Sequence, residues 1–399
     1  MSWEKVKLGD VTDSCLGKML DQVKNKGEYQ PYLANVDVRW GSFDLENLSL
    51  MRFEASEQER YGLKYGDLVI CEGGEPGRCA IWKDQIPGMK IQKALHRVRV
   101  HDCLDYRYLY YWFLLAGQTG ELEQYFTGAT IKHMPGEKLK SVIITKPQIE
   151  VQRKIADILW AYDDLIENNQ KQIKLLEEAA QRLYKEWFVD LRFPGHETTP
   201  ITDGIPQGWS VHKIGERFDT YLGGTPSRAQ PQYWQDGTIP WINSGKVNEL
   251  RVVEPSEYIT ELALNKSATK LLPVHTTLVA ITGATLGQVS YTEITTCANQ
   301  SVVGIVDPST CYEEYIYCYV SNNIKQIISK ATGGAQQHIN KDIVNAFDIV
   351  LPNEKLMASF KNQIAPLFEK IKNLLFQNIW LTEARDRLLP KLMNGEIEV

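Results

Sequence analysis

Long apolar runs are missing from this 399-residue sequence. No stretch approaches the roughly 18 apolar residues that a helix needs to cross a bilayer. The first ten residues, MSWEKVKLGD, also lack the basic-then-apolar order of a secretory signal peptide. We therefore expect a cytoplasmic protein that does not contact a membrane.

Paired cysteines are absent as well. The seven cysteines follow no CxxC spacing, and no cysteine–histidine pattern typical of a zinc site occurs. Their irregular spacing indicates free, mostly buried thiols in a reducing compartment. We expect neither disulfides nor a bound metal ion.

An excess of positive charge is also missing, since the formal net charge is −6 and no segment forms a basic arm. Such a balance argues against indiscriminate binding of nucleic acid. If DNA is the ligand, the basic side chains must gather on one face of each folded domain.

The common catalytic motifs are missing too. The sequence contains no GxxxxGK(S/T) phosphate loop and no GxGxxG, GxSxG or HExxH motif. It also lacks the Asn/Asp-Pro-Pro-aromatic tetrapeptide by which amino-methyltransferases hold a flipped base. These absences indicate a chain without catalytic activity of its own, the alternative being a methyltransferase with an unrecognised site.

An internal repeat is the main feature that the sequence does contain. Residues 127–147 (TGATIKHMPGEKLKSVIITKP) align without a gap to residues 332–352 (TGGAQQHINKDIVNAFDIVLP). Other pairs match upstream, namely 66–70 with 276–280, Gly73 with Gly283, and Gly77 with Gly287. A repeat of this length predicts two domains of like fold.

After each repeat the apolar period changes to the 4-3 spacing of a heptad. The first seam consists of Tyr162, Ile166, Asn169, Ile173, Leu176, Ala180, Leu183 and Trp187. The second consists of Leu367, Ile371, Leu374, Asn378, Leu381, Arg385, Leu388 and Leu392. An asparagine in such a seam often fixes the register. We expect the two helices to pair as an antiparallel coiled coil, the alternative being that each helix packs on its own domain.

The sequence before each helix is β-rich. Short runs such as LVICEG, HRVRV, TLVAITG and SVVGIV are separated by glycine and proline, and one helix is expected in each region, at 105–115 and 312–329. Residues 190–208 have the composition of a linker. The expected fold is α+β with a pseudo-two-fold repeat. Its parts are β-rich domains at 1–147 and 200–352 and helical spacer regions at 148–199 and 353–399.

Several segments resemble a known family. They are ILWAYDDLIENNQKQIKLLEEAAQRLYKEWFVDLRFPGHE (158–197), IPQGW (205–209), LGGTPSRAQPQYWQDGTIPWINSGKV (222–247) and RLLPKLMNGEIEV (387–399). These segments are similar to the specificity subunit of type I restriction–modification enzymes. The similarity covers essentially the whole chain, closely in the helices and in framework only in the β-rich domains.

The resemblance implies two target-recognition domains, each reading one half of a bipartite site in double-stranded DNA. It also implies a coil that sets the spacing of the half-sites and docks two methyltransferase (modification) subunits. Those partners would carry S-adenosylmethionine, so this chain would hold no cofactor, and restriction motor–nuclease subunits would join for cleavage. A stand-alone DNA-binding protein, such as a repressor, is the competing interpretation.

The residues expected to contact DNA are loop residues with donors or acceptors suited to base edges and phosphates. In the first domain they are Gln30, Asn35, Arg39, Arg78, Lys90, Gln92, Lys93, Lys132 and His133. In the second they are Ser227, Arg228, Asn243, Ser244, Lys246, Thr285, Asn299, Gln300, Gln336, Gln337 and His338. Structural alternatives stay open, because Arg78 follows a turn-like GGEPG segment and the two histidines occupy matching repeat positions.

Overall fold

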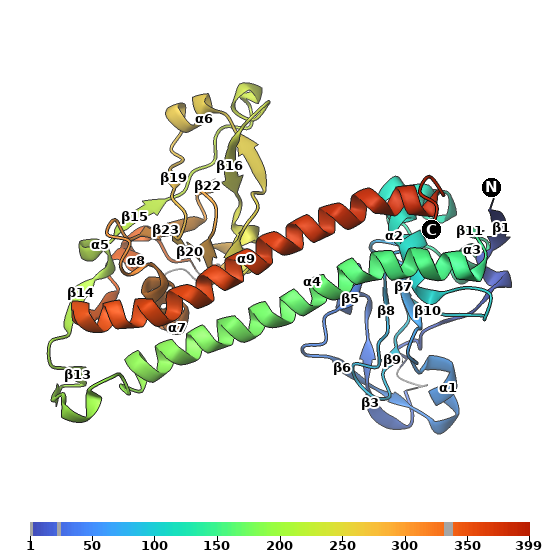
Figure 1. Ribbon diagram of the computed structural model, residues 1–399, viewed down its shortest axis with the longest axis horizontal. Coiled ribbons are helices and arrows are strands. Elements are labelled where there is room, and N and C mark those ends of the chain that lie inside the picture. The colour runs from blue at the N-terminus through green and yellow to red at the C-terminus, as the bar shows by residue number, and fades with distance from the viewer. Residues whose placement is uncertain (1–2, 22–24, 331–337) are drawn as a thin grey trace. The chain divides into compact units, whose positions relative to one another are not determined.

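The structure of the protein is a computed structural model that describes residues 3–21, 25–330 and 338–399. The chain divides into two compact units, each containing one repeat (Figure 1). The N-terminal unit is Met1–Ile166 with Trp380–Val399, and the C-terminal unit is Glu167–Ile379. Within the described residues, no helix combines the length and apolar character that crossing a membrane requires.

The N-terminal unit is built from small sheets and a central helix. A four-stranded sheet has the order β2 (Thr12–Leu16), β10 (Leu95–Val100), β7 (Leu68–Cys71) and β8 (Cys79–Ile81). A three-stranded sheet has the order β6 (Ser49–Phe53), β3 (Glu28–Leu33) and β9 (Lys90–Ile91). Two short pairs join β1 (Glu4–Lys7) to β11 (Ile143–Lys146) and β4 (Val38–Arg39) to β5 (Ser42–Phe43). The helices are α1 (Gln58–Tyr61), α2 (Tyr106–Thr119), α3 (Gly136–Lys140) and the first part of α4 (Ile149–Tyr184).

Strand β7 shows why this unit has two layers of core. Alternate side chains of a strand point to opposite faces. All four residues of β7 are buried, so both of its faces are covered. Leu68 and Ile70 pack with α2, whereas Val69 and Cys71 pack with Leu33 of the three-stranded sheet. Helix α2 begins at its N-cap Asp105, whose carboxylate accepts hydrogen bonds from two backbone N–H groups.

The C-terminal unit repeats this arrangement with one extra strand in each main sheet. Its five-stranded sheet has the order β15 (Asp219–Leu222), β23 (Val302–Val306), β20 (Thr277–Ala280), β21 (Val289–Thr292) and β17 (Arg251–Val252). Its four-stranded sheet has the order β18 (Glu257–Ile259), β16 (Ile239–Ile242), β22 (Thr296–Ala298) and β19 (Leu271–Leu272). The remaining pairs are β14 (Ser210–Lys213) with β24 (Asp348–Leu351) and β12 (Ile201–Thr202) with β13 (Ile205–Pro206). The helices are α5 (Ile214–Arg217), α6 (Glu261–Lys266), α7 (Glu313–Ser329), α8 (Lys341–Asn345) and most of α9 (Glu354–Met393).

The topology confirms the duplication. In both units the sheet farther from α2 or α7 contains a parallel strand pair, β3 with β9 and β16 with β22 (Figure 1). The C-terminal unit has a further parallel pair, β17 with β21, in its five-stranded sheet. The helices expected at 105–115 and 312–329 are also present, as α2 and α7. The predicted linker at 190–208 differs, because it contains the β12–β13 hairpin.

One detail of the predicted repeat register is wrong. The upstream match of 66–70 with 276–280 paired Ile70 with Ala280, but the hydrogen bonds match Cys71 to Ala280. Gly77 N–H donates to the carbonyl of Cys71, and Gly287 N–H donates to that of Ala280. The loop after β20 is therefore one residue longer than the loop after β7. The sequence comparison aligned Leu68-Val69 with Leu278-Val279 because the letters are identical. This alignment is shifted by one residue, and such a shift assigns every side chain of a strand to the wrong face.

Helices α4 and α9 each pass through both units, and within each unit their segments pack against one another. In the C-terminal unit Asn169 contacts Asn378, and the ring of Trp187, in the π-helical turn Lys185–Val189 that follows α4, lies 5.8 Å from that of Phe360. In the N-terminal unit Asp163 contacts Arg385. Residue numbers rise along one helix as they fall along the other, which confirms the expected antiparallel pairing.

Candidate nucleic-acid interface

Polar residues that follow two parallel strands meet at one edge of the N-terminal unit. Leu33 of β3 lies opposite Ile91 of β9, so the residues after both strands emerge at the same edge. The N–H of Gln92 donates to the carbonyl of Leu33 at 3.0 Å and so fixes this junction. A hollow of about 420 Å³ opens there, which we call the edge hollow. It is lined by Met19, Leu20, Asn35, Glu72, Gly73, Gly74, Gln92, Lys93, Ala94 and His133.

Four predicted DNA-binding residues thus share the edge hollow, and a fifth, Arg78, supports it. Asn35 Nδ2 donates to the carbonyl of Gly73 at 2.9 Å. Arg78 Nη2 donates to Asn35 Oδ1 at 3.2 Å, and its Nη1 donates to Glu75 Oε2 at 3.1 Å. These contacts hold the loop after β7 against the segment after β3. The geometry favours a structural role for Arg78, as the turn-like GGEPG segment suggested.

Lys132 and His133 are neighbours in sequence but line different hollows. The backbone of His133 exchanges two hydrogen bonds with Thr127, at 2.7 and 2.8 Å, which closes the loop between them. His133 faces the edge hollow across Gly73, where an added Cβ would lie 2.9 Å from His133 Nδ1. Glycine is therefore required for this close approach.

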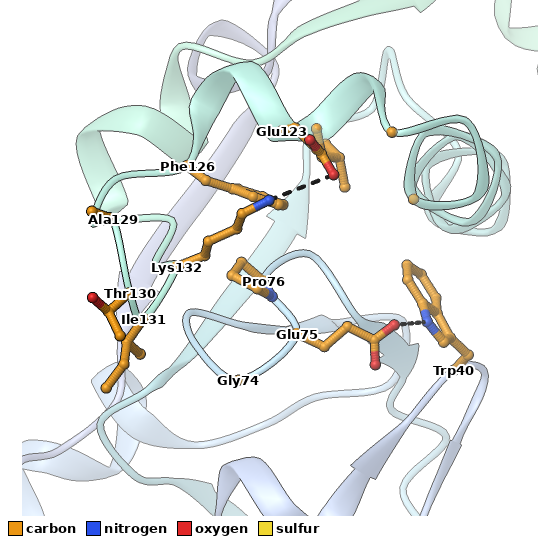
Figure 2. Close-up of a pocket in the computed structure, with 13 residues that line it drawn as sticks. Trp40, Gly74, Glu75, Pro76, Glu123, Phe126, Ala129, Thr130, Ile131 and Lys132 are labelled. Atoms are coloured by element: carbon orange, nitrogen blue, oxygen red, sulfur yellow. Dashed lines mark hydrogen bonds and ion pairs between the residues drawn. The ribbon is translucent and has the colours of Figure 1, made fainter. Parts of the chain in front are cut away.

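Lys132 lines a second hollow, of about 610 Å³, beside the rings of Trp40 and Phe126 (Figure 2). Figure 2 shows Lys132 extending toward Glu123, with Nζ 3.6 Å from Oε1. On the other side of the hollow, Trp40 Nε1 donates to Glu75 Oε1 at 2.7 Å. The Lys132 side chain is half exposed, so it can exchange this exposed ion pair for a phosphate or base edge at little cost.

The remaining predicted residues of this unit lie outside both hollows. Gln30 is a half-buried residue of β3, and Arg39 is exposed and donates to the carbonyls of Val36 and Val38. Lys90 is buried, and its Nζ donates to the carbonyl of Gly88 at 2.6 Å. Burial lowers the pKa of the Lys90 amine. Lys90 therefore offers the least surface of the predicted set.

The C-terminal unit repeats the junction with different side chains. Asn299 N–H donates to the carbonyl of Ile242 at 2.9 Å, as Gln92 N–H does to Leu33. A Cβ added to Gly223 would lie 2.1 Å from the Asn299 carbonyl oxygen, and one added to Gly17 would lie 2.3 Å from that of Gln92. The same backbone frame therefore presents glutamine in one unit and asparagine in the other.

Around this second junction the predicted residues have local partners. Gln300 Oε1 accepts a hydrogen bond from Thr225, and Asn243 Oδ1 accepts from Gly245 N–H at 2.8 Å. Lys246 pairs with Glu249 at 2.8 Å, and Thr285 Oγ1 donates to the carbonyl of Thr282. Ser227 and His338 are exposed, Ser244 is half-buried, and Gln336 and Gln337 lie outside the described residues.

Arg228 is the most constrained predicted residue of this unit. Both of its terminal nitrogens donate to Glu257, at 2.6 and 2.7 Å. Its guanidinium lies 3.5 Å from the ring centroid of Trp234 and 5.6 Å from that of Trp241. Stacking and a bidentate ion pair together hold the loop that carries Ser227 on the four-stranded sheet.

Most residues of the predicted helix seam are buried or half-buried within their own unit. In the C-terminal unit Ile173, Ile371 and Leu374 form a buried cluster with Leu176, and Asn169 Nδ2 donates to Asn378 Oδ1 at 2.9 Å. Ala180 and Trp187 belong to the main core there, with Leu183 and Leu367 beside it. In the N-terminal unit Leu392 is buried and Leu388 packs beside the core, whereas Tyr162, Ile166 and Leu381 are half-buried. The helices thus pair with each other and also pack on the domains.

One seam position in the N-terminal unit holds an ion pair. Arg385 pairs with Asp163, whose other oxygen accepts from Tyr111 Oη at 2.6 Å. Burial alone would lower the pKa of Arg385, but the carboxylates of Asp163 and Asp386 raise it above its ordinary value. Helix α2, α4 and α9 are therefore joined through a single carboxylate.

A buried arginine that the sequence did not single out joins α4 to the C-terminal domain. Arg251 Nε donates to Glu177 Oε1 at 2.6 Å, and Nη1 lies 3.4 Å from Glu293 Oε1. The guanidinium stacks between the rings of Tyr291, Tyr317 and Phe368. Burial raises the pKa of the Glu293 carboxyl, against the opposing effect of Arg251.

Metal-ligating groups do not gather within the described part of the chain, where no three His, Cys, Asp or Glu side chains are placed to hold an ion. All seven cysteines are free thiols, four of them buried. The geometry thus presents two similar edges lined by polar side chains, which suits recognition of an extended polar ligand.

Comparison with known proteins supports this interpretation. A family model described as "Type I restriction modification DNA specificity domain" matches residues 1–178 and 206–377. The specificity subunit of the type I restriction enzyme MjaIX from Methanocaldococcus jannaschii is 32% identical, over 84% of this chain and 78% of the relative. The HindI specificity subunit from Haemophilus influenzae is 21% identical over 99% of both chains.

A solved structure shares the fold. The S subunit of a type I restriction–modification system from M. genitalium matches with a TM-score of 0.58, covering 98% of this chain and 96% of that chain. Its sequence identity is 16%, so this likeness concerns the fold alone.

Proposed function

Because the chain belongs to the family of type I restriction modification DNA specificity proteins, we propose that it reads a bipartite DNA site, one half-site with each unit. In this proposal the chain is a non-catalytic adaptor. It selects the DNA sequence, and its partner subunits carry out the chemistry.

The observation that carries the proposal is the repeated junction with exchanged side chains. Gln92 and Asn299 occupy equivalent positions, and their N–H groups make the same backbone hydrogen bond. A frame that is kept while its polar side chains differ is what two readers of different half-sites require. Glutamine and asparagine each suit an adenine edge, and the neighbouring Lys93 suits a guanine edge.

Support for partner docking comes from the helices. Helix α4 presents exposed apolar side chains, Ile158 and Leu165 in the N-terminal unit and Leu175 in the C-terminal unit, and Trp380 of α9 is exposed as well. We propose that two methyltransferase subunits, each with bound S-adenosylmethionine, dock on the chain and that restriction motor–nuclease subunits join them. The complex would act in the cytoplasm, on cellular DNA.

The test is reconstitution with the methyltransferase subunit of the same system. The purified chain alone should transfer no radiolabelled methyl group to DNA. With the partner present, methylome sequencing should report adenine methylation at one two-part motif. Methyl transfer by the chain alone, or an uninterrupted motif, would overturn the proposal.

A further inference from the structure

Glu72 is an acidic residue in the edge hollow that a search for basic and amide side chains passes over. It follows β7 directly, and its backbone is held on both sides. Its N–H donates to the carbonyl of Ala94 at 2.9 Å, and its carbonyl accepts from Met134 N–H at 2.7 Å. The residue is thus anchored between the segments that carry Lys93 and His133.

The carboxylate of Glu72 is half-buried, and no hydrogen bond or ion pair joins it to any other described side chain. Glu75, three residues on, differs because it accepts from both Trp40 and Arg78. An unengaged carboxylate beside the DNA backbone would be repelled by phosphate. It becomes favourable where it accepts a hydrogen bond from a base.

Comparison of the two units shows that the fold does not need this carboxylate. Ile281 holds the equivalent place in the C-terminal unit, where its N–H donates to the carbonyl of Ser301 and its carbonyl accepts from Ile339 N–H. Ile281 is buried in the apolar core. The same backbone frame therefore folds around an isoleucine, so the backbone arrangement does not require the Glu72 carboxylate.

We propose that Glu72 reads an exocyclic amino group, cytosine N4 or adenine N6, in the half-site of the N-terminal unit. This inference rests on the proposed function. In the major groove these amino groups are the hydrogen-bond donors, whereas thymine O4 and guanine O6 are acceptors. An ionised carboxylate only accepts, so it favours an amino base and repels a keto base at the same position.

The experiment uses the complete complex with its methyltransferase partner and the isosteric variant Glu72→Gln. A glutamine amide can accept or donate, so the requirement for an amino base at one position of one half-site should relax. Discrimination against the keto base there should fall by roughly tenfold, the order expected for one base contact. The matched control is Glu121→Gln, which removes an exposed carboxylate of the same unit outside both hollows and should leave the motif unchanged.

A double-mutant cycle separates the two bases and tests for direct contact. DNA duplexes carry 2-pyrimidinone in place of each half-site cytosine, or purine in place of each adenine other than the methylated one, so that one amino group is deleted at a time and the methyl acceptor is kept. Wild-type complex should lose methylation rate at a single substituted position, and the Glu72→Gln complex should lose no more there, because the contact is already gone.

Additive losses at every position, or an unchanged motif for Glu72→Gln, would overturn the inference while the proposed function stands. A wild-type complex that methylates no two-part motif would instead overturn the proposed function, and the inference with it.

Discussion

The side-chain amide of Asn169 donates a hydrogen bond to Oδ1 of Asn378 at 2.9 Å, inside the helix pair of the C-terminal unit. The same amide donates to Gln377 at 3.0 Å, and Asn169 is buried. An amide pair of this kind, with Asn169 buried and Asn378 half-buried, specifies register, because any other alignment leaves the polar groups against apolar side chains.

Replacing Asn169 by alanine should therefore destabilise the protein by about 1–3 kcal/mol, since Asn378 loses its partner. Replacing both asparagines by leucine should recover or exceed the wild-type stability, at the expense of a defined register. Urea unfolding of the full chain measures both effects. Asn168→Ala, at the neighbouring exposed position, is the control and should change stability by less than about 0.5 kcal/mol. An equal loss in the control would show that the amide pair has no special role.

This asparagine pair was predictable because heptad spacing is a local signal that the sequence displays directly. Pairing of α4 with α9, the two β-rich repeats and the central helices followed from the same kind of signal. The strand register within the repeat was not predictable to the residue. The loops after β7 and β20 differ in length by one residue, but the sequences around them are similar in either register. Only the hydrogen bonds show which register is correct.

The candidate site was predictable by residue type but not by environment. Gln92, Lys93 and His133 do line one hollow, whereas Lys90 has a buried amine and Arg78 is committed to Asn35 and Glu75. Glu72 was missed because the search favoured cations and amides. Arg251 was missed because its partner Glu177 is 74 residues away, and no periodic pattern connects them.

Arg251 should be among the most sensitive positions of the C-terminal unit. Arg251→Leu leaves Glu177 and Glu293 buried without their cation, so we expect a loss of about 3–5 kcal/mol. Arg251→Lys should not restore stability, because an ammonium group cannot combine the ion pair with stacking on three rings. Hydrogen exchange should show reduced protection of β17, β21 and the neighbouring turns of α4. Arg182→Leu, an exposed change on α4, is the control. Unchanged protection in Arg251→Leu would show that the contacts of Arg251 with Glu177 and Glu293 do not stabilise this region.

His275 should make the stability of the C-terminal unit depend on pH. The hydrogen bond from Nδ1 to Glu313, at 3.3 Å, raises the pKa of His275 above its ordinary value of 6.5 in the folded state. Stabilisation by the protonated ring is therefore fully present below about pH 6.5 and is lost as the pH rises through the folded-state pKa. Because the ring is about one-third exposed, the effect should stay below about 1 kcal/mol.

The check for His275 is the difference in unfolding free energy between wild type and His275→Asn, measured from pH 6 to pH 8. Asparagine suits the positive φ of 66° at this position, so the backbone is not strained by the change. The difference should shrink as the pH rises. A constant difference would show that folding does not raise the pKa of His275. Because Glu293 is common to both proteins, its own titration cancels to first order.

The last prediction concerns the spacing of the two half-sites, which helices α4 and α9 should set. A heptad can be added to each helix at facing positions, after Leu176 in α4 and before Ile371 in α9, since these residues share one buried cluster. The Asn169–Asn378 pair and the Glu177–Arg251 contact are both kept. Each helix lengthens by about 10.5 Å at 1.5 Å per residue. At 3.4 Å per base pair, the spacer between half-sites should grow by about three base pairs.

Methylome sequencing of the complex that contains this longer chain measures the spacer directly. Three added base pairs also rotate one half-site by roughly 100° around the duplex, given about 10.5 base pairs per turn. Activity should therefore fall, because the domains must follow the groove.

Both half-site sequences should stay the same, since no residue of either junction is touched. An active variant with the original spacer would show that the helices do not set the distance. Altered half-sites would show that bases are read away from the residues after β9 and β22.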